Sequence, residues 1–207
     1  MAWRLYGVSG CGSTLAEAAL AWAGEPVELV DVEGFDQPGA ARDTLLAVNP
    51  LARVPTLVEP GGDILTESAA IVLRLAELHP ESGLAPAADD PLRAAFLNRL
   101  IWFVSVLYPT FTYRDYPERW APSAPGELTE RVDAFRQSLW LQFEAEVGAG
   151  EWVLGDRPSA LDIYVSVMSQ WRPRRAWIAG HCPKLHRIAL NAEALPQLAP
   201  VMARNFP

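Results

Sequence analysis

Near its N-terminus the chain carries a cysteine whose surroundings favour chemistry at sulfur. Cys11 lies between Gly10 and Gly12 in the stretch SGCGST, directly before an alanine-rich segment. The free N–H groups and partial positive charge at the start of a helix favour a thiolate, the reactive form of cysteine. No second cysteine follows at the Cys-x-x-Cys spacing, so a dithiol redox cycle is excluded. Cys11 is therefore a candidate catalytic thiol, either as a nucleophile or as an S–H donor.

A second candidate site is the polar trio Thr66-Glu67-Ser68, which opens a run of Ala, Ile, Val and Leu. A helix that begins here presents free N–H groups suited to a carboxylate. Ser68 adds a hydroxyl, and Glu67 adds a group that accepts hydrogen bonds from an ammonium. A ligand with an α-carboxylate and an α-amine would match the pair. The alternative is plain helix capping by Thr66 or Ser68.

Pro55 is the first residue of a predicted strand in the stretch RVPTLVE. Proline removes a ladder donor, so within a sheet it belongs at an edge or at the first residue of a strand. We predict a cis Val54–Pro55 bond, which would turn Val54 so that an extended peptide pairs with its N–H and C=O. A trans proline that simply starts the strand is the alternative.

Aromatic residues gather early in the second half of the chain, around Pro109. Tyr108, Phe111 and Tyr113 could line an apolar pocket for a substrate, although such stripes are also typical of a core. Pro109 should end or kink the helix that carries them. The stretch HCPKLH offers His181, Cys182 and His186, but only three ligands on one short segment are a weak metal signal. We expect no metal site.

The elements that position these residues follow from periodicity and turn signals. Strands are predicted at 2–8 and 26–32 with a helix between them that Gly24 closes, which gives a parallel βαβ unit. Thr14 and Glu17 have capping-box spacing at the start of that helix. A short helix at 38–48, a tight hairpin at 55–66 and a helix at 67–78 follow. Beyond a Pro- and Gly-rich linker, helices are predicted at 92–108, 127–147 and 159–171, with two short ones near the C-terminus.

Composition narrows the class of protein. The net charge is −8 over 207 residues, which argues against a nucleic-acid or anionic-membrane partner. The longest uncharged apolar run, 100–113, is shorter than the roughly 20 residues that a membrane span needs. Two widely separated cysteines suit a reducing compartment. We expect a soluble cytoplasmic protein.

The order of these motifs over essentially the whole chain resembles the glutathione transferase family. The resemblance implies a thioredoxin-like α/β domain at 1–78, a linker at 79–90 and an all-α domain at 91–207. RVPTL resembles the family's cis-proline segment and TESAAI its γ-glutamyl-binding turn, which would give Val54, Pro55, Glu67 and Ser68 glutathione-binding roles. Ser159 and Asp162 resemble a capping box of the helical domain, and their spacing fits reciprocal capping.

The catalytic position departs from the family pattern. Cys11 falls in the slot that serine-type enzymes fill with Ser, whereas the beta-class cysteine would fall at Gly12. Tyr6 competes as a tyrosine-type donor, although its place in mid-strand favours a core role. Ser9 and Ser13 are lesser candidates.

The resemblance implies a homodimeric detoxification enzyme. It would conjugate glutathione to a small, hydrophobic electrophile held by Tyr108, Phe111 and Tyr113. Two alternatives stay open: a glutathione-dependent thiol-disulfide oxidoreductase that uses Cys11, and a non-catalytic interaction module.

Overall fold

The computed structural model describes residues 2–207 and divides into two compact units. The first contains the chain up to Ala87 together with Glu193–Pro207, and the second is Ala88–Ala192. The C-terminal residues 193–207, placed by the sequence analysis in the helical domain, thus group with the first unit. The division near Ala87 lies inside the stretch 79–90 that we expected to be a linker.

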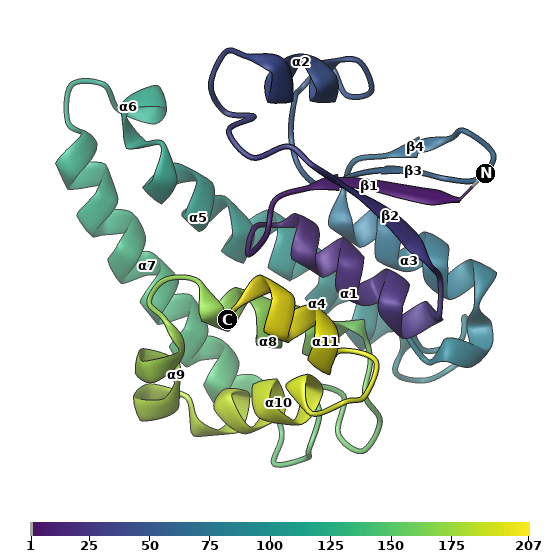
Figure 1. The fold of residues 1–207 in the computed structure, drawn as a ribbon. Coiled ribbons are helices and arrows are strands. Elements are labelled where there is room, and N and C mark those ends of the chain that lie inside the picture. The colour runs from purple at the N-terminus through teal and green to yellow at the C-terminus, as the bar shows by residue number, and fades with distance from the viewer. Residues whose placement is uncertain (1) are drawn as a thin grey trace. The chain divides into compact units, whose positions relative to one another are not determined.

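The first unit is built on a four-stranded sheet in the order β2-β1-β3-β4. Its strands are β1 (Trp3–Gly7), β2 (Val27–Asp31), β3 (Thr56–Val58) and β4 (Ile64–Leu65). β1 and β2 are parallel, as the βαβ prediction required, and β3 is antiparallel to both β1 and β4. The helices are α1 (Ser13–Ala23), α2 (Ala40–Leu46) and α3 (Ser68–Leu78), with the short turn η1 (Pro80–Ser82) and the C-terminal α11 (Ala199–Asn205). The predicted thioredoxin-like fold is confirmed (Figure 1).

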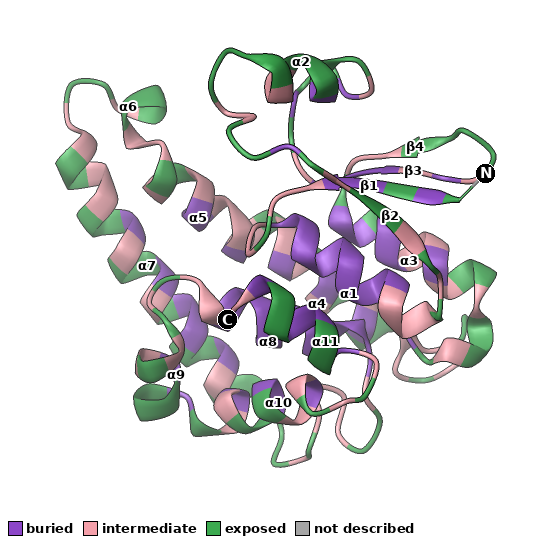
Figure 2. Cartoon of the chain, viewed as in Figure 1, coloured by how far each residue is buried: buried purple, intermediate pink, exposed green. Residues whose placement is uncertain are grey.

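The two faces of the sheet are covered by different helices. α1 and α3 contact each other on one face, and α1 is buried along most of its length (Figure 2). Tyr6 packs on the other face in a cluster with Val32, Leu45 and Ala52, where Leu45 comes from α2. Because strand side chains alternate, Leu5 points to the opposite face, and it is fully buried. Tyr6 is therefore a core residue.

The second unit contains helices only. They are α4 (Arg93–Trp102), the π-helical segment η2 (Phe103–Leu107), α5 (Tyr108–Asp115), α6 (Pro117–Trp120), α7 (Pro125–Glu146), α8 (Ala160–Gln170), α9 (Arg175–His181) and α10 (Pro183–Glu193), whose last residue belongs to the first unit. Its core includes Phe103, stacked on Tyr164 and edge-to-face with Phe143. The predicted capping box of α8 is confirmed, since the backbone N–H of Ser159 donates to Asp162 at 2.7 Å.

Pro109 does not end the helical path. α4 changes into the π-helical segment η2 and continues as α5, with Pro109 in the first turn of α5. Proline has no N–H to donate to the preceding turn, and wide turns are a common way to absorb such a break. The continuous stretch Arg93–Asp115 is long and apolar enough to cross a membrane by length and composition. Core helices pass the same test, and here α4 contacts α8 and α5 contacts α7.

Candidate functional site

Strand register brings three predicted segments to one end of the sheet. Tyr6 of β1 lies opposite Thr56 of β3, and Leu57 of β3 lies opposite Leu65 of β4. The end of β1, the start of β3 and the end of β4 are therefore neighbours, because each adjacent pair is antiparallel. The turn with Cys11 leaves β1 here, the 54–55 segment enters β3 here, and the 66–68 segment leaves β4 here. These residues lie far apart in the sequence.

The segment before β3 offers main-chain groups to a ligand. The Val54–Pro55 bond is cis, as predicted. Val54 is half-buried and precedes the sheet by two residues. Within residues 2–207, neither its N–H nor its C=O has a hydrogen-bond partner in the protein. An extended peptide could therefore pair with both groups, as an added strand does.

A buried asparagine that the sequence analysis missed holds this segment in place. Asn49 is 2% exposed, and its Nδ2 donates to the carbonyl of Arg53 at 3.1 Å and to the hydroxyl of Thr56 at 2.9 Å. Its Oδ1 accepts from the N–H of Leu51 at 3.0 Å, and the hydroxyl of Thr56 donates to Arg53 at 2.8 Å. Asn49 thus fixes the loop on both sides of Val54. The sequence around Asn49 contains no pattern that predicts this role.

Replacing Asn49 with alanine should lower the free energy of unfolding by about 1–3 kcal/mol, because buried polar groups lose their partner. The same change should weaken glutathione binding, since the main-chain N–H and C=O of Val54 are no longer held in position to pair with the ligand. Chemical denaturation and calorimetry measure the two effects. Thr44→Ala is a matched control: it removes a hydroxyl bond to Ala40 on the exposed helix α2, and it should leave glutathione binding unchanged. Undiminished binding by the Asn49 variant would contradict this role.

Helix α3 begins next to this segment. Its N-cap is Glu67, whose side chain makes no capping hydrogen bond, while its carbonyl accepts from the N–H of Ile71 at 3.0 Å. Capping by Thr66 or Ser68, the alternative from the sequence, is therefore not what the structure has. Glu67 is exposed and Ser68 is 7% exposed at the first helical position. The first-turn N–H groups of an α-helix lack intrahelical acceptors, so this end suits an anionic group.

Cys11 lies at the third segment, two residues before α1. It is half-buried, its N–H donates to the carbonyl of Val8 at 3.1 Å, and its own carbonyl accepts from the N–H of Thr14 at 3.0 Å. These bonds shape a tight turn whose next residue, Gly12, is the N-cap of α1. The thiol therefore stands at the positive end of an 11-residue helix.

The serines of this turn are engaged elsewhere. The hydroxyl of Ser13 donates to the carbonyl of Val8 and accepts from its N–H, both at 3.0 Å. A Cβ at Gly7 would lie 2.5 Å from the Cβ of Ser13, so the glycine permits this close approach. Ser9 donates to the carbonyl of Arg204 at 3.3 Å. Tyr6 lies in the core, and both serines bond to main-chain groups. Among these four candidates, Cys11 has the position that best suits catalysis.

The predicted capping box of α1 is wrong. The Thr14 hydroxyl donates to Oδ1 of Asn205 at 2.9 Å, and Glu17 accepts from Nδ2 of Asn205 at 3.2 Å. Both side chains are buried against α11 instead of capping their own helix. Local spacing could not reveal this, because the partner is about 190 residues away in the sequence.

The predicted pocket aromatics fall into two groups within the helical unit. Tyr108 and Phe111 pack edge-to-face on Trp171, with ring centroids 5.7 Å and 5.1 Å away. Tyr113 pairs with Trp120 instead, at 4.9 Å. Phe111 is buried, whereas Tyr108 is half-buried and Tyr113 is exposed. Phe111 thus has the surroundings of a core residue, and the two tyrosines offer ring surface.

Side chains of the HCPKLH segment are engaged in packing contacts. His181 stacks on Trp177 at the end of α9, and Cys182 is fully buried. Burial, with the nearby Glu144 carboxylate, raises the pKa of the Cys182 thiol to about 12, which keeps it protonated. Among residues 2–207, no group of three or more His, Cys, Asp and Glu side chains is arranged to hold a metal ion.

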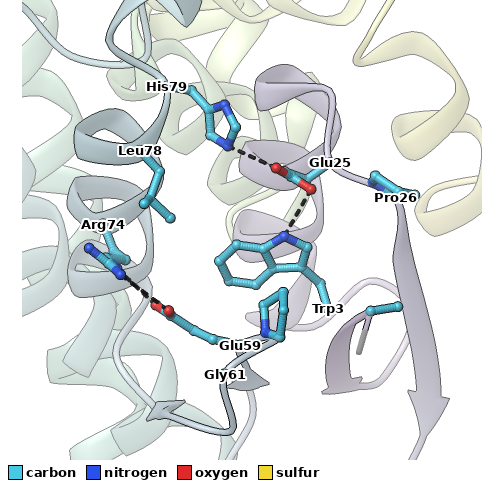
Figure 3. Close-up of a pocket in the computed structure, with 10 residues that line it drawn as sticks. Trp3, Glu25, Pro26, Glu59, Gly61, Arg74, Leu78 and His79 are labelled. Atoms are coloured by element: carbon cyan, nitrogen blue, oxygen red, sulfur yellow. Dashed lines mark hydrogen bonds and ion pairs between the residues drawn. The ribbon is translucent and has the colours of Figure 1, made fainter.

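A cavity of about 490 Å³ lies at the other end of the sheet, away from these segments (Figure 3). Its polar side chains pair with one another: Glu25 accepts from the indole of Trp3 and lies 2.9 Å from His79, and Glu59 pairs with Arg74 at 3.0 Å. Since these groups already pair with one another, we assign no chemistry to this cavity. The predicted site lies at the end of the sheet where the segments that carry Val54, Ser68 and Cys11 are neighbours.

Known proteins are similar to this chain in sequence and in fold. Residues 5–83 match the family model of the glutathione S-transferase N-terminal domain. The chain is 40% identical, over 98% of both chains, to an uncharacterized GST-like protein, YncG, of Escherichia coli K12. It is similar to a crystal structure of a glutathione transferase homologue from Sulfitobacter with bound glutathione (25% identity, TM-score 0.86, 100% and 99% of the two chains covered). It is also similar to a sphingomonad glutathione S-transferase complexed with glutathione (26% identity, TM-score 0.79, 99% and 100% covered).

Together the sheet topology, the cis Val54–Pro55 segment beside the start of α3 and the agreement with these relatives over the full length lead to one conclusion: this chain belongs to the glutathione S-transferase family.

Proposed function

We propose that the protein is a glutathione transferase that joins the glutathione thiolate to a small, hydrophobic electrophile. The observation that carries this proposal is the pair of unpartnered main-chain groups of Val54 at the sheet end where α3 begins. This arrangement suits an extended peptide with an anionic end. Two similar proteins were solved with glutathione bound, which supports the same ligand here.

In this proposal each end of glutathione meets a different part of the site. The cysteinyl backbone pairs with Val54 next to Pro55, and the γ-glutamyl end meets Ser68, Glu67 and the free N–H groups of α3. Cys11 and the turn around it face the sulfur and favour its thiolate. Holding the thiolate against the electrophile supplies the rate enhancement through positioning.

The electrophile pocket and the assembly are part of the same proposal. Tyr108 and Tyr113, with Phe111 packed against both Tyr108 and Trp171, supply an apolar surface in the helical unit. We extend the proposal to a homodimer that works in the cytoplasm. Sedimentation of the purified protein at several concentrations tests the dimer.

Glutathione binding tests the proposal directly. Glutathione at about a hundred times its Kd should stabilise the folded protein by about 2.7 kcal/mol. Thermal unfolding with glutathione and with the dipeptide cysteinylglycine, which lacks the γ-glutamyl group, separates specific binding from a solvent effect. A melting temperature that glutathione does not move would favour the non-catalytic interaction module.

The role of Cys11 separates two reactions, because its position at a helix start also suits a nucleophile. As a donor, its S–H supports the glutathione thiolate, and Cys11→Ser should retain or increase conjugation because a hydroxyl donates more strongly. As a nucleophile, its thiolate attacks a glutathionylated substrate, takes the glutathionyl sulfur into a mixed disulfide and expels the substrate thiolate. A second glutathione thiolate then releases glutathione disulfide.

We expect Cys11→Ser to keep conjugation and Cys11→Ala to reduce it, by loss of one hydrogen bond to the thiolate. Steady-state kinetics with a panel of electrophiles measures this result. Loss of disulfide reduction in both variants, with loss of the glutathione adduct in intact-mass spectra, would show the oxidoreductase instead. If both variants retain every glutathione-dependent activity, Cys11 only packs, and the thiolate is stabilised by other groups.

A further inference from the structure

The side chain of Asn205, at the end of α11, is bonded to the turn that carries Cys11. Its Oδ1 accepts from the N–H of Gly10 at 3.0 Å and from the hydroxyl of Thr14 at 2.9 Å. Gly10 and Thr14 flank Cys11 on both sides, and they lie 195 and 191 positions from Asn205 in the sequence. One amide oxygen thus ties together the two ends of the turn.

The other half of the amide is equally engaged. Nδ2 of Asn205 donates to Oε2 of Glu17 at 3.2 Å and to the carbonyl of Val201 at 2.9 Å. Glu17 also forms an ion pair with Arg204, so α11 meets α1 through a buried carboxylate. Asn205 is 6% exposed, and its oxygen and nitrogen each make two hydrogen bonds. Its orientation is therefore fixed from both helices.

The backbone of the turn is shaped to receive α11. Gly10 has φ of +73°, a conformation that glycine adopts without strain. A Cβ at Gly10 would lie 3.1 Å from the carbonyl oxygen of Asn205 and 3.6 Å from the ring of Phe206. The glycine therefore permits both the turn and the close approach of the chain end.

We propose that Asn205 is a positioning residue for the candidate catalytic turn: through Gly10 and Thr14 it sets the geometry in which Cys11 faces its substrate. The consequence for glutathione rests on the proposed function, but the effect on the Cys11 thiol does not. Asn205 itself touches no reacting atom in this proposal. It acts from the last helix of the chain, which packs against α1 within the first unit.

The first test measures the Cys11 thiol without glutathione. Cys182 is fully buried, so alkylation of the folded protein by iodoacetamide reports on Cys11. Asn205→Ala should change the alkylation rate at least threefold across a pH series, because the turn loses the acceptor shared by Gly10 and Thr14. In the same variant we expect the KM for glutathione to rise about tenfold, equivalent to about 1.4 kcal/mol, with a smaller change in kcat.

A matched control separates positioning from general stability. Val201→Ala shortens a buried side chain one turn earlier on α11 and leaves the Asn205 amide in place. It should lower the melting temperature while the alkylation profile stays that of the parent protein. If Val201→Ala changes the profile as much as Asn205→Ala at equal loss of stability, the turn responds only to stability and the proposal is wrong.

Exchanging the hydrogen-bond donor and acceptor between positions 205 and 17 should restore the geometry of the turn. Asn205→Asp keeps the acceptor for Gly10 and Thr14 but sets a second carboxylate against Glu17, so it should disturb the turn. Adding Glu17→Gln supplies a new amide donor at position 17, and the double variant should recover most of the parent alkylation profile. Failure of this recovery in a folded double variant would contradict the proposal. If the profiles respond as expected but the protein shows no glutathione activity, the positioning role stands and the proposed function fails.

Discussion

Replacing Ser68 with alanine is expected to weaken glutathione binding by about 1–3 kcal/mol, the cost of leaving a buried group without its partner. This corresponds to a Kd about 5- to 150-fold higher. Ser68 is nearly buried at the first position of α3, where, in the proposed mode of binding, the neighbouring N–H groups would attract the γ-glutamyl carboxylate. Isothermal calorimetry on the purified variant measures the change.

A second serine provides the control for this experiment. Ser82 follows α3 at its far end, and its hydroxyl accepts from the N–H of Leu84 at 3.2 Å. Ser82→Ala makes the same chemical change away from the site and should leave Kd unaltered. If Ser68→Ala binds glutathione as the parent does and is only less stable, the hydroxyl serves the helix start and not the ligand.

Replacing Asp162 with alanine is expected to destabilise the protein by about 2–5 kcal/mol, the largest change in stability predicted for this chain. Its carboxyl group is completely buried and accepts from the N–H of Val153 at 2.8 Å and of Ser159 at 2.7 Å. Without these oxygens the N–H groups of Val153 and Ser159 lose their acceptors, and α8 loses one half of its capping box. Urea denaturation at about pH 6 measures the loss.

The ionisation of Asp162 adds a pH dependence. Burial raises its pKa from the ordinary 3.8 to about 7, against hydrogen bonds from Val153 and Ser159 that lower it. A folded pKa above the unfolded one stabilises the folded protein at pH values below the unfolded pKa. This contribution is lost as the pH rises from about 4 to about 7, because ionisation then costs more in the folded state.

Asp162→Asn tests this dependence, because it retains one acceptor oxygen but cannot ionise. The free energy of unfolding of the parent should fall more steeply between about pH 4 and pH 7 than that of the variant. Ser159→Ala is the milder comparison: its hydroxyl accepts from Leu161 at 3.3 Å, and loss of such a cap costs about 1 kcal/mol. An Asp162→Ala protein as stable as the parent would contradict the predicted role of this carboxylate.

Local sequence patterns predicted the elements whose causes are themselves local. Strand-forming residues and turn signals placed β1 and β2, and the apolar run after Glu67 placed α3. The Ser-x-x-Asp spacing predicted the capping box at Ser159 because both partners lie within one turn of helix. The VP dipeptide drew attention to the cis bond at Val54 for the same reason, since the residue and its constraint are adjacent.

The same kind of pattern failed where the partner is distant. Thr14 and Glu17 have the spacing of a capping box, yet α1 begins at Ser13, so Thr14 lies inside the helix. Both side chains bond Asn205 on α11 instead. The fixing of Val54 by Asn49 was likewise invisible, since only the folded loop brings that amide to Arg53 and Thr56.

The sequence by itself therefore predicted which residues could form a thiol-peptide site: Cys11, Val54, Glu67 and Ser68. Tertiary structure decided that their segments share one end of the sheet, because only antiparallel pairing of β3 with β1 and β4 makes those strand ends neighbours. It also decided that residues 193–207 belong with the first unit, since α11 buries its polar end against α1 through contacts that no short stretch of sequence contains.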